Sequence, residues 1–198
     1  RQRQMCIRDR PNSASPIIWG YEADHPFNEQ ARAISSSGLS FRLAPGTATW
    51  RSFSGRWNTA QANLKSAVDS ARIHEAEGIL LTSWGDCGNH QPWSTFYPPL
   101  FFAAQLAWTG REIESKELYS AIDRKSFGGE ESGYAQWICE FGLLDSIIES
   151  EIPNTSLSWD LLFNPRPKIR NEFLRKKISK KNLEAGLEYL VNLEERLC

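Results

Sequence analysis

Between Pro16 and Gly110, short apolar runs alternate with stretches that space their apolar residues as a helix does. The three runs cover residues 17–21, 39–43 and 79–83. None of them alternates apolar with polar residues, and such continuous runs are typical of parallel strands that are covered on both faces. A helix of about ten residues that ends at Gly38 follows the first run, and a helix over 59–77 follows the second. This order predicts an α/β fold with a parallel sheet.

The pattern changes after Gly110, where only helical periodicity continues. A long loop over 84–99 and an apolar helix over 100–108 complete the β/α part of the chain. The helices expected beyond it cover 112–122, 134–150 and 170–197, with a proline-containing break at 164–168. We therefore divide the chain into a β/α region, residues 11–110, and an all-helical C-terminal region, residues 111–198.

The first ten residues, RQRQMCIRDR, differ in composition from the rest of the chain. They hold four arginines and lack the apolar stretch that a secretory signal requires. We interpret residues 1–10 as a non-native leader and leave them out of the fold. Because no signal peptide is visible, a cytoplasmic location is favoured.

Composition and charge narrow the classes of partner. Hydrophobic residues make up 40% of the chain and charged residues 24%, a balance typical of globular proteins, and no apolar stretch approaches a transmembrane span. The net charge of -1 gives no overall attraction to nucleic acid or to anionic lipid. The basic residues at 175–177 and 180–181 are offset by Glu184 and Glu188, so we interpret them as a solvated helix face. We expect no nucleic-acid and no membrane partner, and the oligomeric state stays open.

A first cluster of polar and aromatic residues follows the first apolar run, within WGYEADHPF, residues 19–27. Glu22 and Asp24 are two residues apart and point to the same side if the chain stays extended, with His25 beside them. Carboxylates at the end of a parallel strand can accept hydrogen bonds from sugar hydroxyls or transfer protons. In the alternative interpretation, Asp24 caps the next helix and His25 is a packed loop residue.

The second cluster, APGTATWRSFSGRW, covers residues 44–57. It contains no G-x-x-x-x-G-K pattern, so a phosphate-binding loop is not predicted. An exposed tryptophan beside a strand end is suited to stacking on the apolar face of a pyranose, and Trp50 is the candidate here. Alternatively, Trp50 packs against the next helix or closes the bottom of a barrel formed by such strands. Trp57 is as well suited to packing against that helix as to stacking on a sugar.

The third cluster, TSWGDCGNHQPW, covers residues 82–93 and carries the most information. Trp84 and Asp86 are two residues apart, which places an aromatic ring and a hydrogen-bond acceptor on one side of the strand end, with His90 in the same loop. One alternative is a purely structural loop. Another is a metal site built from Asp86, His90 and His25, although no H-x-H or H-E-x-x-H spacing supports it.

These three stretches, in this order, resemble the last three strand ends of bacterial exo-β-N-acetylhexosaminidases of glycoside hydrolase family 20. The matching text is WGYEADHPF, PGTATW with the Gly-Arg that follows it, and SWGDCGNHQP, and the likeness covers roughly residues 16 to 110. The resemblance implies a (β/α)8 TIM barrel, of which residues 11–110 would form a partial glycosidase domain with about three β/α units. It also implies retaining hydrolysis in which the sugar's own acetamido oxygen attacks the anomeric carbon.

In that family, aromatic side chains enclose the acetamido group, and a Trp-x-acid pair on the last strand holds the hydroxyls of the terminal sugar. The resemblance carries these roles to Trp84, as part of the wall, and to Asp86, as the acceptor, although the family often has Glu at the second position. The remaining candidates for contact with the sugar are Trp50, Trp19, Tyr21, Glu22, Asp24, His25 and His90.

The family's adjacent Asp-Glu pair, which orients the acetamido group and protonates the leaving oxygen, lies on an earlier strand without a counterpart in this sequence. We therefore expect a fragment of a β-N-acetylhexosaminidase that carries no catalytic residue, is inactive alone and uses no metal or cofactor. Its partner would be a glycan that ends in N-acetylhexosamine, with the linkage and the choice between GlcNAc and GalNAc left open. The alternatives are a non-catalytic sugar-binding or structural remnant, and a metal-dependent barrel hydrolase.

Overall fold

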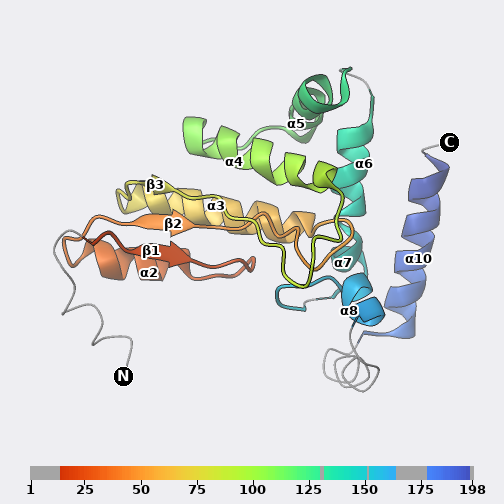
Figure 1. The fold of residues 1–198 in the computed structure, drawn as a ribbon, viewed down its shortest axis with the longest axis horizontal. Coiled ribbons are helices and arrows are strands. Elements are labelled where there is room, and N and C mark those ends of the chain that lie inside the picture. Colours follow the sequence, from red (N-terminus) through yellow and green to blue (C-terminus); the bar gives the residue numbers. More distant parts are fainter. Residues whose placement is uncertain (1–13, 130–131, 151, 164–177, 197–198) are drawn as a thin grey trace.

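The computed structural model describes residues 14–129, 132–150, 152–163 and 178–196. The expected leader (1–10), the proline-containing break (164–168) and the basic residues 175–177 lie outside the described residues. Figure 1 shows a small sheet at one end of the molecule and a group of helices toward the other. The β/α part precedes the helical part along the chain, as the hydrophobic pattern predicts.

The described strands form an open, parallel sheet in sequence order, β1-β2-β3. Their bounds are β1 (Ile17–Trp19), β2 (Arg42–Ala44) and β3 (Gly78–Ile79). Ile18 lies opposite Leu43, which in turn lies opposite Ile79. Beyond β3, a single parallel bridge joins Gly46 to Thr82, so contact between the second and third runs continues past the strand ends. Parallel pairing is confirmed, whereas each strand is shorter than its apolar run.

One face of this sheet is covered by two helices, α2 (Phe27–Ser35) and α3 (Trp57–Ile73). Ile18 and Leu43 point toward these helices and are 6% and 0% exposed, so their removal from water stabilises this layer. Ile17 and Trp19 alternate with Ile18 along β1 and point to the opposite face, where they are 46% and 65% exposed. That face is open to solvent at these positions, although continuous apolar runs predict cover on both faces.

Further helices follow the third strand. In chain order they are the 3₁₀ turn η1 (Trp93–Phe96), α4 (Tyr97–Thr109), α5 (Ser115–Ile122), the π-helical turn η2 (Asp123–Phe127), α6 (Tyr134–Phe141), α7 (Leu144–Ile147), α8 (Leu157–Phe163) and α10 (Lys180–Glu195). Helix α4 begins earlier than the predicted helix over 100–108 because Pro98 and Pro99 fall in its first turn, where proline is tolerated. Helix α8 was not predicted from the sequence.

The single helix expected over 134–150 is wrong, because Gly142 divides it into α6 and α7. The carbonyl of Gly142 accepts a hydrogen bond from the N–H of Trp57 at 2.9 Å and is thereby turned toward the start of α3. A Cβ placed at Gly142 would lie 2.9 Å from the Cβ of Trp57, so only glycine allows this close approach.

The helical part packs against the far side of α3. A buried cluster joins α3 to α4, α5 and α6 through side chains that include Leu64, Phe102 and Ile122. Helix α10 contacts α6 and α7 and lies on their far side from the sheet (Figure 1). On α10, Lys180 and Glu184 form an ion pair at 3.4 Å, which fits the expected solvated face. None of the described helices combines the length and the apolar character that crossing a membrane requires.

Candidate functional site

Three tryptophan rings, from the end of β1 and from the loops after β2 and β3, gather around Tyr21. The centroid of the Tyr21 ring lies 5.7 Å from that of Trp19, 5.1 Å from that of Trp50 and 6.1 Å from that of Trp84. All four side chains line one cavity of about 670 Å³, which we call the aromatic pocket. Because the carboxyl ends of parallel strands meet at one edge of a sheet, loops that are distant in sequence meet here, as the sequence predicts.

The rings differ in how they are held. Trp50 is 1% exposed and forms the buried base of the pocket, whereas Trp19 and Trp84 are 65% and 46% exposed and stand at its sides. A Cβ placed at Gly46 would lie 2.6 Å from the Trp50 ring and 2.7 Å from the Tyr21 ring. Only glycine at this position leaves room for the two rings to meet edge to face.

Polar groups complete the rim of the aromatic pocket. Asp86, Thr82, Arg51 and Asn154 line it together with the rings. Asp86 is exposed, and no other described residue donates a hydrogen bond to its carboxylate, so this acceptor is available to a ligand. Flat apolar rings beside an open carboxylate can hold a ligand that has both an apolar face and hydroxyl groups.

One buried amide ties the loops together. Asn63, on α3, is 0% exposed and lies behind the first two strand ends. Its Oδ1 accepts a hydrogen bond from the Gly46 N–H at 3.0 Å, and its Nδ2 donates to the carbonyls of Gly20 at 3.1 Å and Glu22 at 2.8 Å. The side chain therefore fixes the backbone on both sides of Tyr21 relative to the loop that carries Trp50.

Hydroxyl groups connect the second loop to the third. Thr47 Oγ1 donates to Ser83 Oγ at 2.8 Å and lies 2.9 Å from Thr49 Oγ1, and Thr82 Oγ1 donates to the Pro45 carbonyl at 2.8 Å. These contacts lie directly behind Trp84 and set the spacing of the two loops. The aromatic pocket is thus built on a hydrogen-bonded base rather than on free loops.

Three residues of the first cluster lie outside the aromatic pocket, contrary to the expected convergence. Glu22 pairs with Arg56 at 3.1 Å and accepts a hydrogen bond from the Asn154 N–H at 2.7 Å. Asp24 is exposed and lines a different cavity. His25 lies 3.3 Å from Gln30 Oε1, and burial lowers the pKa of this imidazole below its ordinary value, against the smaller raising effects of Gln30 and Asp24.

His90 also lies away from the aromatic pocket. Its Nδ1 accepts a hydrogen bond from the indole N–H of Trp159 at 3.2 Å, and its ring centroid is 4.5 Å from that of Phe163. Both partners belong to α8, the helix that the sequence did not predict. His90 therefore packs the third loop against the helical part of the chain.

Sequence reasoning missed a segment from the helical region, residues 154–160, that closes over the loops. Asn154 reaches the rim of the aromatic pocket, and the Arg51 carbonyl accepts hydrogen bonds from Ser156 N–H at 2.9 Å and Thr155 Oγ1 at 3.1 Å. The Arg51 guanidinium lies 3.6 Å from Asp160 and 4.7 Å from the Trp159 ring centroid. The position of Arg51 directly after Trp50 could have indicated that it lies near the pocket. No neighbouring residue in the sequence indicates the same for Asn154.

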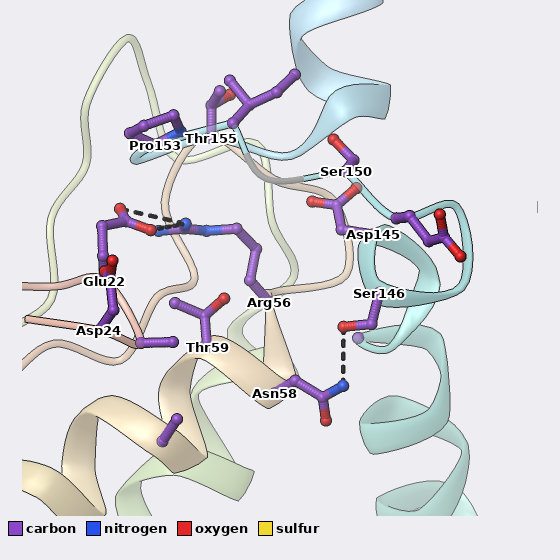
Figure 2. A pocket seen from close by; sticks show the side chains of 15 residues that line it. Glu22, Asp24, Arg56, Asn58, Thr59, Asp145, Ser146, Ser150, Pro153 and Thr155 are labelled. Carbon is purple, nitrogen blue, oxygen red and sulfur yellow. Dashed lines mark hydrogen bonds and ion pairs between the residues drawn. The ribbon is translucent and has the colours of Figure 1, made fainter. Parts of the chain in front are cut away.

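A second cavity lies on the other side of Glu22 and is polar; we call it the polar pocket (Figure 2). Its volume is about 550 Å³, and it shares no lining residue with the aromatic pocket. Asp145, on its wall, accepts a hydrogen bond from the Leu157 N–H at 3.1 Å. Burial raises the pKa of Asp145 to about 6, against the lowering effects of that hydrogen bond and of Arg56.

Within the described parts of the chain, no three His, Cys, Asp or Glu side chains come close enough together to hold a metal ion. His25, Asp86 and His90, which the sequence offered as possible ligands, lie in three separate places.

In comparisons with known proteins, no family model and no curated protein matches this chain.

Proposed function

We propose that the aromatic pocket binds the terminal N-acetylhexosamine of a glycan, as part of a β-N-acetylhexosaminidase of glycoside hydrolase family 20. The observation that carries the proposal is the convergence of Trp19, Trp50 and Trp84 on Tyr21, with Asp86 on the same cavity. These are the residues to which the motif resemblance assigns the sugar. Their convergence supports the proposal independently of the motifs, because it depends on the fold.

The chemistry of the aromatic pocket suits a neutral sugar. A pyranose presents C–H groups on one face, which stack on indole and phenol rings, and hydroxyls at its edge, which donate to carboxylates. The Asp86 carboxylate and the Thr82 hydroxyl offer such acceptors at the rim. Arg51, the cation among the described residues that line the pocket, is already paired with Asp160, so these residues offer no free positive charge to an anionic ligand.

The fold supports the larger assignment to a TIM barrel. A parallel sheet is ordinarily covered on both faces, and here Ile17, Trp19 and Leu80 expose apolar surface on the face opposite α2 and α3. In the proposed barrel this face is the interior, and the Asp-Glu acid/base pair is supplied by a strand outside these residues. Sugar binding in the aromatic pocket would then position the anomeric carbon for that pair.

The test is binding of N-acetylglucosamine to the 198-residue chain, followed by tryptophan fluorescence and by calorimetry. We expect saturable binding, and we expect Trp84→Ala to weaken it by about 1 to 3 kcal/mol, the scale of a lost aromatic contact. Trp108→Ala is the matched control, because Trp108 is 91% exposed on α4 and lies outside the aromatic pocket. Its affinity should equal that of the unchanged chain.

Two results would overturn the proposal. One is the absence of saturable binding, and the other is an affinity that Trp84→Ala and Trp108→Ala change equally.

A chromogenic N-acetylglucosaminide should be bound without turnover, because the proposal places no acid/base residue in the aromatic pocket. Chelators should leave binding unchanged, whereas a metal-dependent hydrolase would lose it.

A further inference from the structure

The polar pocket lies between the loop after β1, the start of α3, and the segment from α7 to Thr155. Figure 2 shows Arg56 reaching across it toward Glu22, with Asp145 and Ser150 on the opposite side. A volume of about 550 Å³ is sufficient for a ligand the size of a monosaccharide. No role for this cavity follows from the proposed function, because none of its residues belongs to the aromatic pocket.

Acidic side chains outnumber basic ones on its wall. The carboxylates are those of Glu22, Asp24, Asp145 and Glu149, and the guanidinium is that of Arg56. Glu22 is neutralised by its pairing with Arg56, and among the described residues that line the polar pocket no further cation stands beside the other three acids. A surplus of negative charge attracts a cation and repels phosphates, sulfates and carboxylates. Since the described acids do not converge on one point, an extended organic cation fits better than a metal ion.

A second observation points to a ligand that also accepts hydrogen bonds. The Arg56 side chain is 4% exposed, and among the described residues its hydrogen-bond partner is the Glu22 carboxylate, which accepts from Nη1. Its Nε and Nη2 have no hydrogen-bond partner, and neither does the buried Oγ of Ser150. Leaving buried donors unpaired is unfavourable, so a ligand oxygen that accepts a hydrogen bond from Arg56 or Ser150 would be stabilised there.

We propose that the polar pocket binds a small amine that carries several hydroxyl groups, such as an amino sugar with a free amine. The ammonium group faces the Asp145 carboxylate, the hydroxyl oxygens lie along Arg56 and Ser150, and Asp24, on the side of Glu22, adds to the negative potential of the pocket. Asn58, Thr59 and Ser146 add neutral groups that both donate and accept. A neutral polyol leaves the acids without a counter-charge, and a simple alkylamine leaves Nε and Nη2 of Arg56 without an acceptor, so both bind less tightly.

The experiment uses glucosamine as the probe and the full 198-residue chain, in calorimetry at neutral pH. To keep the aromatic pocket out of the measurement, every titration is repeated in the Trp84→Ala background. We expect saturable binding of glucosamine there, at least about tenfold tighter than that of N-acetylglucosamine, whose acetyl group removes the charge.

Asp145→Asn should weaken glucosamine binding at least about tenfold, because it removes a charge from the wall while its amide oxygen can still accept from Leu157. Asp24→Asn should weaken binding about threefold, since Asp24 is more exposed and better screened by solvent. Asp69→Asn, an equal change of charge at an exposed site of α3 outside the polar pocket, should leave it unchanged.

The proposal is overturned if glucosamine does not bind saturably, if Asp69→Asn weakens binding as much as Asp145→Asn and Asp24→Asn do, or if N-acetylglucosamine binds equally well in the Trp84→Ala background. Loss of glucosamine binding through Trp84→Ala alone would assign the ligand to the aromatic pocket and would also overturn it. The proposed function does not depend on the outcome, because its readout is N-acetylglucosamine binding lost through Trp84→Ala.

Discussion

At the scale of single residues, Asn63 is the side chain on which the candidate site depends most. It is fully buried, and its three hydrogen bonds satisfy one backbone N–H and two backbone carbonyls of two different strand-end loops. The Glu22 carbonyl also accepts from the His25 N–H at 3.2 Å, whereas the Gly46 N–H and the Gly20 carbonyl depend on Asn63, and a buried polar backbone group without a partner is costly. Asn63 therefore stabilises the fold and positions the rings at the same time.

We expect Asn63→Ala to lower the free energy of unfolding by about 2 to 4 kcal/mol, because the Gly46 N–H and the Gly20 carbonyl lose their partner and a small cavity forms. Denaturation by urea, followed by circular dichroism, measures this change. Asn58→Ala is the control on the same helix, because Asn58 is exposed and its hydrogen bond to Ser146 lies at the surface. A loss of similar size in both variants would contradict the role assigned to Asn63.

The residue scale also shows where sequence reading succeeds. Trp19, Tyr21, Trp50, Trp84 and Asp86 meet because each ends or follows a parallel strand at the same edge of the sheet, and that rule needs no knowledge of side-chain contacts. The acids and histidines of the same motifs do not meet there. Their positions are decided by partners that no local pattern reveals.

Glu22 and His90 are the examples. Glu22 lies outside the aromatic pocket because it pairs with Arg56 and accepts a hydrogen bond from the backbone of Asn154. His90 lies outside it because it accepts a hydrogen bond from Trp159. Asn154 and Trp159 come from the helical region, which lies far along the chain. Predicting these positions would have required the tertiary packing of α8 against the third loop.

At the scale of elements, Asp145 links two short helices. It belongs to α7, and its carboxylate accepts a hydrogen bond from the N–H of Leu157, the first residue of α8. Neither helix is long enough to be stable by itself in water. The contact therefore sets the angle at which the chain leaves α7 and places the segment that closes over the aromatic pocket.

The raised pKa of Asp145, about 6 against an ordinary 3.8, makes this link dependent on pH. The folded chain binds the Asp145 proton more tightly than the unfolded chain does. The protonated side chain therefore contributes fully to the free energy of unfolding below about pH 4, and this contribution is lost as pH rises through about 6. The unchanged chain loses stability as Asp145 ionises between about pH 4 and about pH 6. Over this range we expect Asp145→Asn to become more stable than the unchanged chain, by up to about 3 kcal/mol. Thermal unfolding of both proteins across that range measures the difference, and a constant difference would contradict the assignment.

Element order followed from the sequence, whereas element bounds did not. The alternation of apolar runs with helical patterns correctly predicted a parallel sheet followed by helices. The division at Gly142 depends on the approach of Trp57 from a helix that begins some 85 residues earlier, which periodicity does not reveal. Helix α8 has 7 residues, too few for a helical period to be recognised in the sequence.

At the scale of the whole molecule, the sheet is covered on one face and exposes apolar side chains on the other. Ile17, Trp19 and Leu80 are 46%, 65% and 48% exposed on or just beyond the strands. The outer edges of β1 and β3 have no neighbouring strand among the described residues. Such a surface favours association, both through burial of apolar area and through pairing of free backbone groups.

We expect the 198-residue chain to associate as its concentration rises, and we expect Ile17→Lys to weaken that association about tenfold, because it places a charge on the open face. Sedimentation velocity over a range of concentrations measures this. Leu187→Lys is the matched control, since Leu187 is 64% exposed on α10, away from the sheet. Equal effects of the two changes would place the contact elsewhere.

The order of the strands has a consequence for biosynthesis. Each strand pairs with the strand made just before it, so the sheet can grow as the chain leaves the ribosome. The segment at 154–160 is different, because its hydrogen bonds to Arg51 and Glu22 span 104 and 132 residues. Contacts of such long range form late, since a large loop must close first. The contacts that Asn154 and Thr155 make at the rim of the aromatic pocket therefore form only after the segment at 154–160 has been translated, later than the pairing of the three strands.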